Sequence, residues 1–169
     1  MELLLKSGAA LDGIRGERTP LHCAVYSRHP ATVALLPKNK ADPNRADRYG
    51  TMPLACAAGN GDFASVRMLL DAGGDFEAAD EYGWRPLHTA LRSTGCSDAN
   101  RLATVGILPD CGADPNAENA GGFQRDGEHD SHLGFRLATL PNEGNRPVTI
   151  AKSNDFTEIV ELLKARGGR

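Results

Sequence analysis

The residues with the widest capacity for chemistry lie close together in the last third of the chain. Carboxylates and imidazoles, which zinc and calcium accept as ligands, occur at Asp126, Glu128, His129, Asp130 and His132. Four glycines flank or interrupt this cluster, so nothing rigid would orient the ligands. We interpret the segment as a solvated loop, with adventitious metal binding as the alternative, and we expect no built metal site.

Catalytic patterns are missing from the sequence. Covalent or acid–base catalysis needs a nucleophile or a titrating group held in a pocket. The chain contains no Ser-His-Asp arrangement, no phosphate-binding loop and no dinucleotide-binding pattern. We therefore expect a protein that is not an enzyme and that has no cofactor.

Charge and hydropathy exclude two further classes of partner. The 169 residues carry 19 Lys and Arg against 22 Asp and Glu, a net charge of −3, which argues against nucleic-acid binding by bulk electrostatics. No apolar run approaches the roughly 18–20 residues that a membrane-spanning helix needs. The length suits one ordinary domain or one short array of repeats.

The elements that would position these residues recur at a fixed interval. The step from Pro20 to Pro53 equals the step from Pro53 to Pro86, and a longer step leads to Pro147. Two insertions account for the longer step: a short one of six between Pro86 and Asp114, and a long one between Asp114 and Pro147. The chain therefore consists of repeats of about 33 residues, a length typical of stacked repeat architectures.

The residues around each proline indicate the kind of repeat. The first copy reads Thr19-Pro20-Leu21-His22-Cys23-Ala24, which resembles the T-P-L-H-x-A signature of ankyrin repeats. Looser copies begin at Met52, Arg85 and Arg146, and the resemblance extends over nearly the whole chain.

The resemblance implies an all-α solenoid of helix-turn-helix units with hairpin loops: four repeats preceded by half of another. We expect a single domain over 1–169, with a partial repeat at 1–12, repeats at about 14–46, 47–79 and 80–116, a long hairpin insertion at 117–143 and the last repeat at 144–169. The first residues match a second-helix pattern, so we expect the chain to be trimmed from a longer protein.

Local chemistry supports these units. Proline loses nothing in the first turn of a helix, and Thr19 can cap the helix that it precedes. A second apolar pattern follows each proline, at Val33, Leu35 and Leu36 and at the equivalent positions of the other repeats. The segments Asp47–Gly50 and Asp80–Gly83 predict hairpin tips between repeats.

The cysteines and histidines have structural interpretations in this frame. Cys23 and Cys56 share a repeat position, so we expect them to stack in the helical core, too far apart for a disulfide. Reduced cysteines suit the cytoplasm or nucleus. The resemblance implies that His22 and His88 form hydrogen bonds between repeats, and it gives His29 a structural role as well.

The rare aromatics carry the functional signal. Tyr49, Tyr82 and Trp84 fall at hairpin tips and Tyr26 near the end of a first helix, positions that line the partner-binding concave groove in the family that the chain resembles. Tyr, Trp and Arg are enriched in binding hot spots. The expected partner-binding residues are Tyr26, Arg48, Tyr49, Tyr82, Trp84, Arg85 and Arg92. The alternative is that the hairpin aromatics only pack across adjacent tips.

We therefore expect a non-enzymatic, monomeric protein of the cytoplasm or nucleus that binds a protein or peptide partner. Two alternatives remain. The chain could be a regulatory segment of a larger enzyme or channel that docks intramolecularly, or a substrate for asparagine hydroxylation. The segments Asp42-Pro43-Asn44 and Asp114-Pro115-Asn116 resemble the hydroxylation pattern of ankyrin repeats, except for their prolines.

Overall fold

The described part of the chain is a stack of helix pairs. The computed structural model describes residues 11–13, 17–93, 96–119 and 146–169, and the regular elements in these ranges are all helices. They pair in sequence as α2 (Pro20–Tyr26) with α3 (Pro30–Lys38), α4 (Pro53–Gly59) with α5 (Phe63–Asp71), α6 (Pro86–Arg92) with α7 (Asp98–Asp110), and α8 (Pro147–Ser153) with α9 (Thr157–Ala165). The expected all-α repeat architecture is confirmed.

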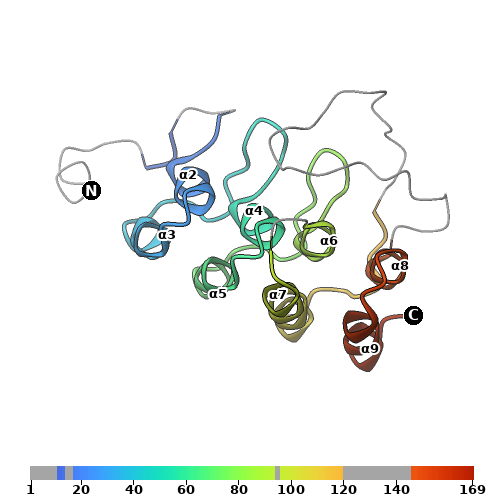
Figure 1. The fold of residues 1–169 in the computed structure, drawn as a ribbon. Coiled ribbons are helices and arrows are strands. Elements are labelled where there is room, and N and C mark those ends of the chain that lie inside the picture. The colour runs from blue at the N-terminus through green and yellow to red at the C-terminus, as the bar shows by residue number, and fades with distance from the viewer. Residues whose placement is uncertain (1–10, 14–16, 94–95, 120–145) are drawn as a thin grey trace.

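The pairs stack side by side in two rows. Figure 1 shows the first helices α2, α4, α6 and α8 in one row and the second helices α3, α5, α7 and α9 in the other. Each first helix contacts the next first helix, and each second helix contacts the next second helix. The loops between repeats project beyond the first-helix row, so hairpin tips and second helices lie on opposite sides of the stack.

Every first helix begins at a proline, as the spacing predicts. The missing N–H of proline costs nothing there because the first amides of a helix have no intrahelical acceptor. Thr19 caps α2 by accepting a hydrogen bond from the His22 amide, and the His22 side chain accepts one from the Thr19 amide in return. Asp62 caps the second helix α5 by accepting a hydrogen bond from the Ser65 amide.

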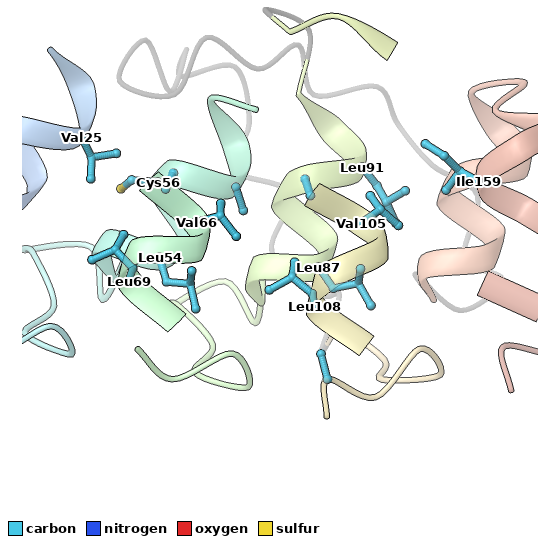
Figure 2. Close-up of a cluster of buried hydrophobic side chains, with 14 of the residues drawn as sticks. Val25, Leu54, Cys56, Val66, Leu69, Leu87, Leu91, Val105, Leu108 and Ile159 are labelled. Carbon is cyan, nitrogen blue, oxygen red and sulfur yellow. The ribbon is translucent and has the colours of Figure 1, made fainter. Parts of the chain in front are cut away.

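The core forms between the two rows from positions that repeat along the chain. The residue after each proline is buried, and so is the alanine three positions further on. In the second helices the outer two of the three expected apolar positions are buried, as in Val66 and Leu69, while the middle one, such as Met68, is half-buried. Figure 2 shows side chains from neighbouring repeats meeting in one cluster. Because each repeat buries its apolar surface against its neighbours, stability arises from stacking.

The shorter insertion lengthens a helix. Helix α7 has 13 residues, whereas α5 and α9 have nine each. Matching Val105 with Val66 places the extra turn of α7 at residues 98–101. Arg101 in this turn is buried: it donates to the Ser93 carbonyl at 2.7 Å, pairs with Asp98, and lies over the Phe156 ring at 4.4 Å. The insertion is thereby fixed against the last repeat.

The expectation for Cys23 was wrong, while that for Cys56 is confirmed. Cys56 is buried and Cys23 is exposed. At the equivalent position of the third repeat, Thr89 donates to the Ala55 carbonyl of the preceding repeat at 3.1 Å, so this position faces the preceding first helix. Cys23 belongs to the first described helix pair, where no described helix covers it.

Three expectations lie outside the described residues: the partial repeat through residue 10, the Asp126–His132 cluster, and most of the 117–143 insertion. In the described ranges, no helix combines the length and the apolar character of a membrane span, and no three potential metal ligands gather.

Candidate functional site

An aspartate builds each described hairpin tip between repeats. Asp47 Oδ1 accepts the amide hydrogens of Tyr49 at 2.9 Å and Thr51 at 3.0 Å. Asp80 Oδ1 does the same for Tyr82 at 2.9 Å and Trp84 at 2.8 Å. A glycine with positive φ closes each turn, at 73° for Gly50 and 78° for Gly83, a conformation that costs glycine little. The two tips therefore present their aromatic residues in the same way.

The two tips also touch. The Glu81 amide donates to the Tyr49 carbonyl at 3.2 Å, and a Cβ added at Gly50 would lie 3.0 Å from the Glu81 amide nitrogen. Both tyrosines are half-buried. The tips that carry Tyr49 and Tyr82 are thus fixed to each other across the repeat boundary by backbone contacts.

Trp84 belongs partly to the core and partly to the surface. Its half-buried ring packs against the hydrophobic cluster and meets the His88 ring edge-on at a centroid distance of 5.9 Å. The Arg92 guanidinium lies 3.9 Å from the ring centroid. These contacts fix the indole orientation, so a partner would meet a preorganised aromatic edge at low entropic cost.

Tyr26 forms an equivalent pair two repeats earlier. Arg18 lies over its ring at 4.4 Å, and its hydroxyl contacts Cys56 Sγ at 3.4 Å. Trp84 follows Arg18 by two repeat lengths, and Arg92 follows Tyr26 by the same interval. The same two repeat positions therefore hold a cation–aromatic pair twice, with the types exchanged. Sequence reasoning missed Arg18, although this offset of two repeats could have revealed it.

Burial sets the protonation of the groups at the Tyr26 end. It raises the pKa of the Tyr26 hydroxyl well above its usual range. It also raises the pKa of the Cys56 thiol to about 12. Cys56 is thus a protonated thiol near neutral pH, and a thiol in that state is a poor nucleophile.

The two remaining arginines of the expected site differ in what they contact. Arg48 is exposed and lies over the Tyr49 ring at 4.8 Å. Arg85 is half-buried, bonds the Glu77 and Glu118 carbonyls at 3.2 Å each, and pairs with the Glu77 carboxylate. Arg85 therefore links repeats, while Arg48 adds charge beside the tyrosines. Whether any of the seven residues contacts a partner stays a prediction.

The structural role of two histidines is confirmed. His22 Nε2 lies 3.0 Å from the Thr51 carbonyl and His88 Nε2 lies 2.9 Å from the Ala117 carbonyl, each across a repeat boundary. Since a carbonyl only accepts, Nε2 carries the proton in both rings. Burial lowers the pKa of His22, which keeps this ring neutral. His29, by contrast, precedes α3, is exposed and makes no capping hydrogen bond with its side chain.

The residues that resemble hydroxylation targets also bridge repeats. Asn44 donates to the Gly73 carbonyl and accepts from the Asp75 amide, and Asn116 does the same with Gly167 and Arg169. Glu77, at the equivalent position of the second repeat, accepts from the Asp114 amide. A modifying enzyme would have to displace these contacts. The sequence analysis missed this series of hydrogen bonds between repeats because Glu77 replaces Asn in the middle repeat.

Comparison with family models and with solved structures finds ankyrin repeats in both cases. A family model of three ankyrin repeats matches residues 34–119, and a model of a single ankyrin repeat matches residues 16–48. Among solved structures, an ankyrin repeat domain from Acinetobacter baumannii is 22% identical, with a TM-score of 0.79, over 99% of this chain and 74% of that one. The comparison with curated proteins returned no match.

Proposed function

The chain belongs to the ankyrin-repeat family, and we propose that it is a non-enzymatic module that binds a protein or peptide through its hairpin-side surface. Ankyrin repeats are generally protein-interaction modules. Because one fold hosts many functions, the proposal rests on the site itself. The observation that carries it is the hairpin-tip position of Tyr49, Tyr82 and Trp84, with an arginine over the rings of Tyr49 and Trp84.

The physical basis is low ordering cost. Binding loses about 0.5–1.5 kcal/mol for each flexible side chain that it immobilises. Tyr26, Tyr49 and Trp84 are already held by the core, by backbone contacts and by guanidinium groups. A partner that covers them therefore gains apolar contact with little further loss of side-chain entropy.

Selection from a phage library of random dodecapeptides on the immobilised chain tests the proposal. We expect enriched sequences whose binding is lost in Tyr82→Ala and in the Tyr82→Ala/Trp84→Ala variant. Lys38→Ala, at an exposed position of α3, is the matched control and should bind as the original chain does.

Because Trp84 also packs against the core, its removal lowers stability, and Tyr82→Ala is the cleaner variant. Thermal unfolding of each variant separates lost binding from lost folding. If no peptide is enriched, or if folded Tyr82→Ala and double variants bind undiminished, the hairpin-side surface is not the site.

A further inference from the structure

A shallow groove of about 700 Å³ lies on the second-helix side of the stack, between α5, α7 and α9. In Figure 1 these helices form the row opposite the hairpin loops. Apolar side chains from all three line the groove, among them Phe63, Leu102 and Leu162. It is therefore separate from the proposed peptide-binding surface.

Small residues of α7 keep the groove open. Ala99, Ala103 and Gly106 follow one another at intervals of four and three residues, on one face of the helix, and all three line the groove. Gly106 is helical and needs no special φ; an added Cβ would meet only Leu162 Cδ2, at 3.6 Å. Glycine inside a helix lowers helix stability by about 1 kcal/mol relative to alanine, so what Gly106 contributes to the groove is its small size.

The shorter insertion is part of this surface. Ala99 lies in the extra turn of α7, and the buried Arg101 holds that turn against the last repeat. The insertion thus extends the small-residue face in a rigid way.

The two walls of the groove carry opposite charges. Arg67 lies on α5 and Glu158 on α9; both are exposed and line the groove. Neither forms an ion pair with another described residue. Asp110 and Arg166, which also line the groove, pair with each other at 2.7 and 3.0 Å. The groove therefore offers one cation and one anion to an occupant.

We propose that the occupant is a second copy of this chain. Rotation by 180° about an axis parallel to α7 would place α7 on α7 and α5 of each copy against α9 of the other. Arg67 would then face Glu158 of the second copy twice, as a two-fold contact requires. Counted from the start of its own helix, Arg67 is the fifth residue of α5 and Glu158 the second of α9, an offset of about 4.5 Å that two long side chains can span.

The contact is of the weak, transient class because the groove is shallow and its ion pairs are exposed. The monomer that the sequence leads us to expect would be the state at low concentration. Dimerisation would leave both hairpin sides open and so present two peptide-binding surfaces, which raises avidity for a partner with repeated motifs.

Sedimentation velocity of the full chain from about 5 to about 500 µM tests this dimer. We expect the weight-average mass to rise from 18.0 kDa towards twice that value. Arg67→Glu and Glu158→Arg should each raise the dissociation constant about tenfold, and the double reversal should restore it to within about threefold. Lys38→Glu, an exposed reversal on α3 with the same charge change as Arg67→Glu, is the control.

The proposal is overturned if the chain stays at the monomer mass throughout, if the single reversals act no differently from Lys38→Glu, or if the double reversal fails to restore association. Rescue by the double reversal is the decisive result, because a variant that merely misfolds would not recover.

Discussion

Replacement of His22 by Leu should destabilise the stack through one repeat boundary. His22 is fully buried, and its ring accepts from Thr19 and donates to the Thr51 carbonyl at 3.0 Å. Leucine has a similar volume, so the substitution removes hydrogen bonds without opening a large cavity. The Thr19 amide loses its acceptor, while the Thr51 carbonyl loses one of two donors and keeps the Asp47 amide at 3.0 Å.

The expected loss follows from those two groups. The unpartnered Thr19 amide costs about 1–3 kcal/mol and the lost bond to Thr51 about 0.5–1.5 kcal/mol, so His22→Leu should lower the free energy of unfolding by about 2–4 kcal/mol. The Tm of a domain of this size falls by about 2–4 °C for each kcal/mol of lost stability, which gives a fall in Tm of about 10 °C.

Urea unfolding followed by circular dichroism measures this loss. His29→Leu is the matched control, since the His29 side chain is exposed and makes no capping hydrogen bond. Substitution of such a surface side chain is expected to change the free energy of unfolding by no more than about 0.5 kcal/mol. A loss below about 1 kcal/mol for His22→Leu, or equal losses for the two variants, would refute the role of this histidine between repeats.

Three further predictions concern stability. Burial lowers the pKa of His22, so the unfolded chain takes up a proton on His22 at a higher pH than the folded chain does. The free energy of unfolding should therefore fall as the pH drops below about 6.5. The urea midpoint should fall less between pH 7.5 and pH 5.5 in His22→Leu than in the original chain. Arg101→Ala should cost about 2–4 kcal/mol because it removes the hydrogen bond to the buried Ser93 carbonyl and the packing of a buried side chain on the Phe156 ring. Amide exchange in α9 should accelerate; unchanged exchange would exclude the link to the last repeat. Gly61→Ala should cost more than about 1 kcal/mol, since φ is 59° and the new Cβ would lie 2.1 Å from Cys96 Cβ. Added Cys96→Gly should recover part of this loss in thermal unfolding, and no recovery would count against the contact.

The regular interval of the prolines predicted the architecture because each repeat position has one environment. Pro20 and its equivalents begin helices, and the following Leu or Val is buried wherever it occurs. Such positions can be interpreted from sequence alone because stacking repeats the same contacts.

Residues at the margins of the repeat were less predictable. Cys23 shares a position with Cys56 but belongs to the first described pair, so the neighbour that buries Cys56 has no described counterpart at Cys23. The spacing of the repeat positions predicted that the shorter insertion exists. That it forms an extra turn of α7 depends on tertiary contacts of Arg101, which no local sequence pattern encodes.

The candidate site was predictable in its residue types and less so in its contacts. The tip positions of Tyr49 and Tyr82 followed from the spacing of Asp47 and Asp80. The sequence did not predict that Arg85 links repeats through Glu77 and Glu118, because these bonds join residues 8 and 33 positions apart.

The emission of Trp84, the only tryptophan in the chain, tests the central claim most directly. A library-selected peptide is titrated into the chain while calorimetry measures its binding independently. We predict a saturable change in Trp84 emission with the same dissociation constant as the calorimetric one. Full binding with unchanged emission would contradict the claim that partners bind over the Tyr82 and Trp84 surface.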